Sequence, residues 1–191
     1  MGERILNLPN LITILRLAAV PVVGWLILQE QWAAACWLFL VAAVSDGIDG
    51  FFARWLDLMT PLGAALDSVA DKALGLVTLV MLTKVGAIPL WVTLAILLRD
   101  TVIVAGALSY RGMAGHLEIH PTWLGKTHMF VEFTMLSLVL GGLAELLVLE
   151  DWRLPMFAVV FGIAVASGVQ YVWIWGAKAL RERAAARLKA R

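Results

Sequence analysis

The segment Ser45–Asp71 reads SDGIDGFFARWLDLMTPLGAALDSVAD, and it concentrates acidic residues within otherwise apolar surroundings. Its four relevant aspartates are Asp46, Asp49, Asp67 and Asp71. The first two are three residues apart and the last two are four apart, so each pair shares one face of a helix. Two antiparallel helices joined by a short connection would turn both faces inward, and the four carboxylates would then meet in one small volume.

Such a cluster needs cations, because like charges at close range disfavour ionisation. Carboxylate oxygens are ligands for hard cations such as Mg²⁺, which also binds substrate phosphates. Two divalent cations would neutralise four carboxylates, and a pair of ions can clamp both oxygens of a phosphoryl displacement. Helix capping by scattered acids explains Asp57, but carboxylates inside a membrane are costly and usually functional. We therefore predict a site for two ions, Mg²⁺ or Mn²⁺, on Asp46, Asp49, Asp67 and Asp71.

Small residues and one arginine flank these acids. Gly50, Ala53 and Gly63 lack bulk and would let a ligand approach the backbone closely. Arg54 adds a fixed cation suited to a phosphate. The surroundings of the acidic cluster therefore favour a phosphate-bearing ligand.

The composition indicates a membrane protein. The 191 residues are 62% hydrophobic and 15% charged, with a mean hydropathy of +0.89, whereas soluble domains carry about 25% charged residues. Backbone groups in lipid must be satisfied internally, so the spanning segments are expected to be helices. Cys36 stands alone, which excludes a disulfide framework. We predict an all-α integral membrane protein whose six transmembrane helices lie near residues 10–29, 32–55, 61–83, 87–110, 123–147 and 154–177.

Lysine and arginine residues gather at alternate ends of these blocks. Their excess near residues 1–10, 54–61, 110–123 and 177–191 predicts that both termini are cytosolic. The expected organisation is one membrane domain over residues 1–177 with a basic cytosolic tail over 178–191, which is rich in alanine and arginine and is expected to extend the last helix. The protein is expected to be a multi-pass protein of the inner (cytoplasmic) membrane, with its site facing the cytosol.

The acidic segment resembles the signature of the CDP-alcohol phosphotransferase family at every fixed position. That signature is Asp46-x2-Asp49-Gly50-x2-Ala53-Arg54-x8-Gly63-x3-Asp67-x3-Asp71. The opening Asn7–Thr13 with Arg16, the Arg99-Asp100 pair and the Pro121–Lys126 segment also look like bacterial phosphatidyltransferases of this family.

The resemblance implies transfer of a phosphatidyl group from CDP-diacylglycerol to the hydroxyl of a glycerol-type acceptor, with release of CMP. It implies that Asp46, Asp49 and Asp67 are the principal metal ligands. Asp71 would complete the second metal site and act as the general base. It further implies CDP-lipid contacts from Asn10, Thr13, Asp49, Gly50, Ala53, Arg54 and Gly63. Family members are commonly homodimers; the expected partners are membrane lipids and the two substrates, with no nucleic acid.

The acceptor is less constrained by the sequence. Residues 99–108 are similar to CMP-forming cardiolipin synthases, which use phosphatidylglycerol, whereas phosphatidylglycerophosphate synthases use glycerol 3-phosphate. The glycerophosphate enzymes often carry a second lysine where this chain has His128, and cardiolipin synthases usually have Asn-Thr there. We favour phosphatidylglycerol and keep glycerol 3-phosphate as the alternative. Acceptor-binding residues are expected to be Arg99, Arg111 and Lys126.

Several of these residues have simpler interpretations. Arg99 and Asp100 could form an ion pair that joins helices, and Arg111 and Lys126 could extend toward lipid headgroups. The histidines at positions 116, 120 and 128 are expected to be loop residues facing water. Glu132 is expected to pair with a cation, and a direct contact with substrate is the alternative.

Two other functions are compatible with intramembrane aspartates. An intramembrane prenyltransferase would have more helices and two acidic motifs far apart. A divalent-cation transporter would place acids at mid-membrane on several helices and carry an inverted repeat. The clustering of these aspartates in one helical hairpin favours the phosphotransferase.

Overall fold

The structure is a computed structural model of the whole chain. Its described backbone comprises residues 8–55, 61–114, 122–148 and 150–189. Within these helices, side chains are described for residues 12–45, 67, 69–109, 122–148 and 151–178. The described backbone is helix with short turns and contains no strand, which confirms the predicted all-α class for this part of the chain.

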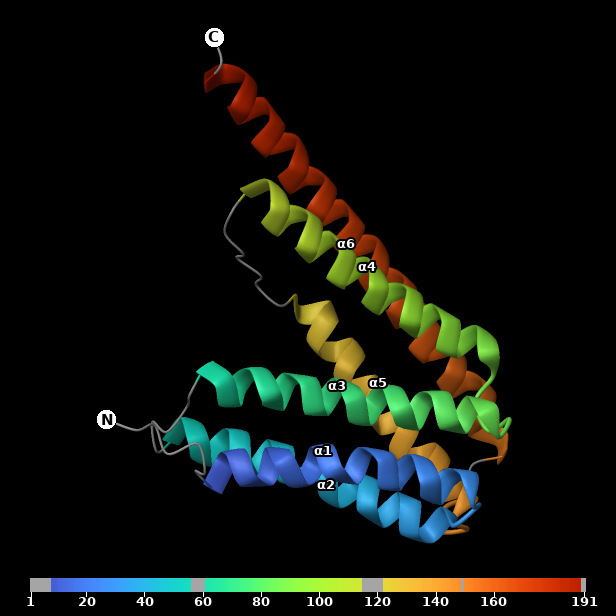
Figure 1. Cartoon of the computed structure of the whole chain (residues 1–191). Helices are drawn as coiled ribbons and strands as arrows, with labels where there is room; N and C mark the ends of the chain where they lie inside the picture. Colours follow the sequence, from blue (N-terminus) through green and yellow to red (C-terminus); the bar gives the residue numbers. More distant parts are fainter. Residues whose placement is uncertain (1–7, 56–60, 115–121, 149, 190–191) are drawn as a thin grey trace. The chain divides into compact units, whose positions relative to one another are not determined.

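In the described residues, six α-helices and one 3₁₀ helix follow one another (Figure 1). They are α1 (Leu8–Leu28), α2 (Trp32–Trp55), α3 (Pro61–Lys84), α4 (Leu90–Ala114), α5 (Trp123–Leu143), η1 (Glu150–Trp152) and α6 (Arg153–Lys189). The first four agree with the predicted apolar blocks to within a few residues. Pro61 is the first residue of α3, a position where the missing N–H of proline costs nothing.

The end of α5 differs from the prediction. The helix ends at Leu143 and not at residue 147, because Glu145 adopts a left-handed backbone with φ of 58°. The amide of Leu146 then donates to the carbonyl of Gly141 at 3.0 Å, a hydrogen bond that closes the helix end. Leu147 folds back onto Gly141, where a side chain would come within 3.0 Å of its Cδ1. The apolar residues after Leu143 therefore pack on the helix without extending it.

Helix α6 extends beyond the expected membrane span, as predicted for the alanine- and arginine-rich tail. The helix continues past residue 177 to Lys189. Alanine, leucine, arginine, lysine and glutamate make up this extension, and all are strong helix formers. The expected tail is therefore a continuation of the last helix.

The described chain forms two compact units. Unit 1 contains residues 1–89 and 133–151, and unit 2 contains residues 90–132 and 152–191. The boundary falls within α5, so this helix contributes its first half to unit 2 and its second half to unit 1. The apolar pattern gave no indication of this division.

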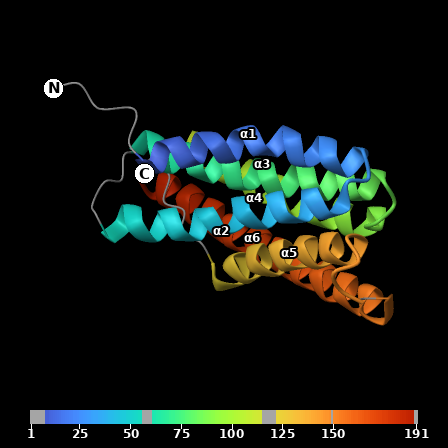
Figure 2. The same cartoon turned by 90° about the horizontal axis from the view of Figure 1, so that it is seen from below.

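In unit 1, α1 lies along both α2 and α3, and the direct contact between α2 and α3 is small (Figures 1 and 2). Val23 and Ile27 of α1 and Leu74 of α3 are fully buried. A side chain at Gly24 would come within 3.0 Å of Val77 Cγ1, so the glycine permits the close approach of α1 to α3. Helix α1 is therefore the central element of unit 1.

In unit 2, α4 and α6 lie side by side over much of their length (Figure 1). Trp91 packs edge-on against Phe161, with ring centroids 5.2 Å apart. Further along, the ring of Trp175 lies against Gly106, where a Cβ would be only 2.4 Å from Trp175 Cδ1. Only glycine fits this position without moving the indole ring.

We therefore expect Gly106→Ala to destabilise unit 2. Overpacking typically costs about 1–3 kcal/mol, which exceeds the helix propensity that alanine adds. Thermal unfolding of the purified protein in detergent measures the effect. Gly162→Ala is the matched control, because a Cβ there would meet nothing within 4 Å beyond the adjoining residues and backbone of its own helix. A midpoint for Gly106→Ala equal to or above that of Gly162→Ala would contradict the expected clash.

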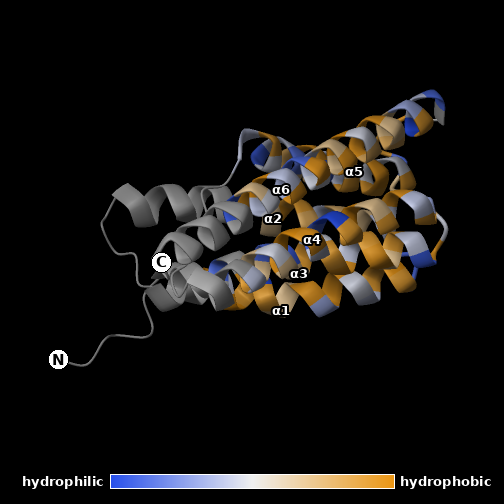
Figure 3. Ribbon diagram, turned by 90° about the horizontal axis from the view of Figure 1, so that it is seen from above, coloured by the Kyte–Doolittle hydropathy of each residue, from blue (hydrophilic) through white to orange (hydrophobic). Residues whose placement is uncertain are grey.

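Apolar residues cover most of the length of α1, α3 and α5 in Figure 3. Among the described residues, two helical segments are long and apolar enough to cross a bilayer, Leu90–Ser109 and Arg153–Lys178. The shorter segments Ile12–Leu28 and Trp32–Ser45 are also apolar. The number of membrane spans and the side on which the termini lie remain predictions.

Candidate active site

An arginine from α1 binds two of the predicted metal ligands on α3. Arg16 Nη1 donates to Asp67 Oδ1 at 2.9 Å and to Asp71 Oδ1 at 3.1 Å. Arg16 is only 3% exposed and Asp71 is buried, while Asp67 is partly open to solvent. Two carboxylates that are 51 and 55 residues from this arginine in sequence are thereby brought to one nitrogen atom.

Helical spacing explains this geometry. Asp67 and Asp71 are four residues apart on α3, so their side chains lie one above the other on one face. Thr13 and Arg16 are three residues apart on α1, and both are buried. Because α1 lies along α3, these two faces meet. The predicted CDP-lipid residue Thr13 therefore lies on the same face of α1 as the arginine.

The donor set fits a divalent cation. The Oδ1 atoms of Asp67 and Asp71 already converge on one cationic nitrogen within 3.1 Å. Carboxylate oxygens arranged in this way suit Mg²⁺ or Mn²⁺. Among the described side chains, no group of three or more His, Cys, Asp or Glu residues converges. The further predicted ligands, Asp46 and Asp49, lie outside the described side chains.

The position of α2 limits how far away Asp46 and Asp49 can be. Helices α2 and α3 run antiparallel, and α2 ends on the side of unit 1 where α3 begins (Figure 2). From residue 55 to residue 61 there are six Cα steps, which span at most about 22 Å. The predicted meeting of all four carboxylates is compatible with this arrangement and remains a prediction.

The remaining predicted site residues of the first three helices also lie outside the described side chains. These are Asn10, Gly50, Ala53, Arg54 and Gly63, and in α4 the same holds for Arg111. Their helices are described, so Asn10 is placed in the first turn of α1 and Arg54 at the end of α2.

A second polar cluster lies in unit 2 around Arg99. Arg99 Nη1 binds Asp100 Oδ1 at 2.6 Å, and Nε donates to Ser167 Oγ at 3.3 Å. The guanidinium carbon lies 5.8 Å from the centre of the Tyr171 ring. The predicted ion pair with Asp100 is thus present, but it joins neighbours on one helix. Of the contacts that Arg99 makes, those with Ser167 and Tyr171 join α4 to α6.

The first turn of α5 adjoins this cluster. Thr122 caps the helix, because its Oγ1 accepts a hydrogen bond from the amide of Gly125 at 3.1 Å. The amide of Thr122 donates to the Tyr171 hydroxyl at 3.4 Å. Arg99 Nη2 lies 3.4 Å from the position that a Cβ of Gly125 would occupy. A helix N-terminus favours anions, and Arg99, which is also paired with Asp100, lies beside this one.

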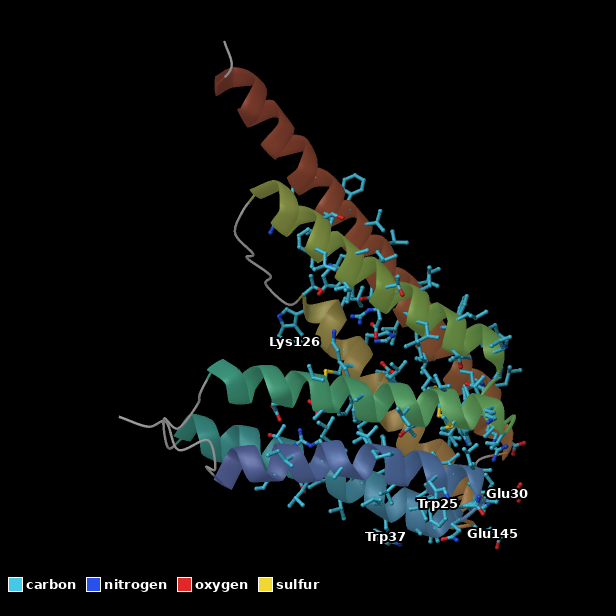
Figure 4. The ribbon with its side chains drawn as sticks, in the orientation of Figure 1. Trp25, Glu30, Trp37, Lys126 and Glu145 are labelled. Atoms are coloured by element: carbon cyan, nitrogen blue, oxygen red, sulfur yellow. The ribbon has the colours of Figure 1, made fainter. Side chains whose placement is uncertain are left out.

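Lys126 lies on the exposed side of this first turn (Figure 4). Its backbone amide donates to the carbonyl of Thr122 at 3.1 Å, and its side chain is open to solvent. Its predicted contact with the acceptor is compatible with that exposure and remains a prediction.

The expectation that His128 faces water is wrong. His128 lies within α5, the expected fifth helix, and is only 1% exposed, because it falls on a buried face of that helix. Its Nδ1 lies 3.6 Å from Glu132 Oε2, one helical turn further on. Glu132 therefore has a histidine as its close neighbour. The positions of His116 and His120 lie outside the described residues.

These observations define a class: an all-helical, strongly apolar chain that holds paired carboxylates suited to a divalent cation. Comparison with known proteins identifies the family to which the chain belongs. The model of the CDP-alcohol phosphatidyltransferase family matches residues 6–180, and the chain therefore belongs to this family of enzymes. Its members are membrane proteins that act on a CDP-activated lipid and an alcohol acceptor, generally with a divalent metal ion.

Curated relatives carry two different names. The chain is 34% identical over 188 residues to a CMP-forming cardiolipin synthase of Streptomyces coelicolor, which covers 91% of this chain and 80% of that protein. It is 32% identical over 187 residues to a probable phosphatidylglycerophosphate synthase of Mycobacterium tuberculosis, covering 94% and 84%. It is 38% identical over 106 residues to the CMP-forming cardiolipin synthase of Rattus norvegicus, where the match covers 55% of this chain. The chain spans about a third (35%) of the length of the rat protein.

Arg16 was not among the predicted site residues. The signal was present in the sequence, since Arg16 is the one charged residue between residues 5 and 29, a predicted membrane segment. A charge in such a segment needs a partner and usually marks a functional site. Its two partners could not be named, because the sequence does not reveal that α1 packs along α3.

Proposed function

We propose that the protein transfers a phosphatidyl group from CDP-diacylglycerol to the hydroxyl of phosphatidylglycerol, forming cardiolipin and CMP. The acceptor oxygen attacks the lipid-bearing phosphorus, the bond from this phosphorus to the bridging diphosphate oxygen breaks, and CMP leaves. The single observation that carries the proposal is the convergence of Asp67 and Asp71, two signature positions of the family, on one cationic nitrogen.

In this proposal the aspartates have two roles, metal binding and proton transfer. Asp46, Asp49, Asp67 and Asp71 hold two divalent ions, Mg²⁺ or Mn²⁺. The bound ions would supply Lewis-acid stabilisation of the diphosphate. Asp71 takes the proton from the acceptor hydroxyl, which needs a carboxylate within hydrogen-bond reach of that oxygen. The hydrogen bond from Arg16 keeps this carboxylate ionised and fixes its orientation.

The nucleotide is expected to lie along the first three helices. Small residues leave room for its close approach, and Arg54 and Thr13 offer polar contacts. The buried position of Thr13 on the Arg16 face of α1 supports a contact near the phosphates. The proposed CDP-lipid residues are Asn10, Thr13, Asp49, Gly50, Ala53, Arg54 and Gly63.

Arg99 is proposed as the anchor for the acceptor's phosphate, with Arg111 and Lys126 as further cations. Asp100 and Ser167 bind two of its three guanidinium nitrogens, so the group is held in one orientation. The remaining nitrogen, Nη2, lies beside the first turn of α5. An oriented guanidinium next to a helix N-terminus is well suited to a phosphate.

The proposed setting is a membrane with six spans, both termini and the active site on the cytosolic side, and a homodimer as the working form. Trp25 and Trp37 are exposed near one end of unit 1, at the turn between α1 and α2 that carries Glu30 (Figure 4). Tryptophan is enriched at membrane interfaces. Large exposed apolar side chains along the helices, such as Leu98 and Val169, support contact with lipid.

The acceptor assignment has a direct test. The purified protein is incubated with CDP-diacylglycerol and either phosphatidylglycerol or glycerol 3-phosphate, and CMP and the lipid product are quantified. We expect cardiolipin with the first acceptor and little product with the second. Phosphatidylglycerophosphate formation would identify the alternative acceptor. Absence of CMP release with both acceptors and with other alcohols would contradict phosphatidyl transfer itself.

The proposed anchor predicts a selective kinetic defect. Arg99→Ala should raise the KM for the acceptor at least about tenfold, since a charge-assisted hydrogen bond to a phosphate contributes about 1.5–3 kcal/mol. The KM for CDP-diacylglycerol should change less than about twofold. Steady-state kinetics with each substrate varied in turn measure both values, and Arg153→Ala controls for the loss of one positive charge in unit 2. A larger effect on the CDP-lipid would contradict the assignment.

A further inference from the structure

Arg16 lies between two carboxylates that are predicted to bind a metal ion. The side chain is 1% exposed, and one nitrogen, Nη1, binds both Asp67 and Asp71. This places a permanent positive charge between two carboxylates of the metal-binding signature. We propose that Arg16 is a positioning residue that orients these carboxylates without metal and lowers their affinity for divalent cations. This inference rests on the proposed metal site.

The first step of the argument concerns charge. Arg16, Asp67 and Asp71 together carry a formal charge of −1, and without the guanidinium the pair would carry −2. A buried carboxylate is costly unless it is paired and hydrogen-bonded. Arg16 supplies a countercharge and one hydrogen bond to each carboxylate, which favours an ordered pair before any metal binds.

The second step concerns competition. A divalent cation that binds the Oδ1 atoms must either share them with Nη1 or displace it, since both oxygens lie within 3.1 Å of that nitrogen. In either case the positive charge of Arg16 opposes the arriving ion, and this opposition is weakly screened because the group is buried. Removing the charge should therefore strengthen metal binding.

The experiment is a titration with Mn²⁺ alone, followed by the electron paramagnetic resonance signal of the free ion. We expect Arg16→Gln to bind Mn²⁺ roughly tenfold more tightly than the unaltered chain, a change that corresponds to about 1.4 kcal/mol. Arg16→Met removes the same charge and carries the same expectation if the glutamine variant cannot be purified. Unchanged or weaker binding in these variants would overturn the proposal.

Two controls separate charge from other effects. Arg16→Lys keeps the charge and should bind Mn²⁺ within about threefold of the unaltered chain; tightening equal to that of Arg16→Gln would overturn the charge argument. Lys84→Gln removes a charge from the far end of α3, thirteen residues from Asp71. That is about 20 Å along the helix, beyond the screening length at physiological salt. An equal effect there would also overturn the proposal.

A second readout tests the orienting role. In EDTA, Arg16→Gln should unfold at a lower temperature than the unaltered chain, and Mn²⁺ should raise its midpoint by more, because tighter binding gives greater stabilisation. Equal midpoints in EDTA would overturn that role. These measurements do not depend on turnover. If the proposed function is wrong, CMP release will be absent although the variants rank in Mn²⁺ affinity as predicted. If this inference is wrong, CMP release will be present but the variants will not show that ranking.

Discussion

Asp71→Asn should abolish CMP release, with a loss of roughly a thousandfold or more, because a general base alone contributes about 10²–10⁴-fold. The amide cannot accept the proton of the acceptor hydroxyl. It also removes one negative charge from the cluster around Arg16 and so weakens metal binding. In the unaltered chain Arg16 Nη1 donates a hydrogen bond to Asp71 Oδ1 at 3.1 Å. The asparagine oxygen can still accept this hydrogen bond. The fold and most of the affinity for CDP-diacylglycerol should therefore remain.

The measurement is the rate of CMP release at saturating substrates, together with binding of the CDP-lipid to the purified variant. Asp151→Asn is the matched control, because this aspartate is exposed in the 3₁₀ helix before α6. It should leave the rate within about twofold. Full activity in Asp71→Asn would remove this residue from the role of base, and loss of both activity and folding would assign it a structural role.

The helices could be predicted from the sequence because lipid-compatible segments must satisfy their own backbone hydrogen bonds. The ends of the helices were harder to predict. Hydropathy extends through Leu146 and Leu147, but the chain turns at Glu145 and lays Leu147 on Gly141. That contact is local to the helix end and depends on the left-handed backbone of Glu145, and no apolar count reveals it. The extension of α6 to Lys189 could be predicted, since alanine, leucine, arginine, lysine and glutamate all form helix readily.

The candidate site could also be predicted only in part. The spacing of Asp67 and Asp71 correctly placed both on one face of α3. The partner of that face could not be found from spacing, because consecutive helices were assumed to pack most closely. In unit 1, α1 packs along α3, and Arg16 is therefore the residue that reaches the carboxylates. The burial of His128 could not be predicted for a related reason: the residue lies inside the expected fifth helix, but which face of that helix is buried depends on how the helix packs.

Metal withdrawal should have the second large effect, and it should separate catalysis from folding. In excess EDTA we expect CMP release to fall at least about a hundredfold, because metal-assisted stabilisation of the diphosphate contributes several kcal/mol. Mg²⁺ or Mn²⁺ should restore the rate, and the ion that does so at the lower concentration identifies the preferred metal. EDTA already saturated with Mg²⁺ is the control for effects of the chelator on the detergent.

Folding should survive the same treatment. Removing an ion present at a hundredfold excess over its Kd costs only about 2.7 kcal/mol of stability. Arg16 remains bound to Asp67 and Asp71 when the ion leaves, so these carboxylates keep a countercharge. The unfolding midpoint in EDTA should therefore fall by less than about 10 °C while activity is lost. Unfolding on chelation would mean that the ion, and not Arg16, holds α3 against α1. Full activity in EDTA would mean that the carboxylates act without metal.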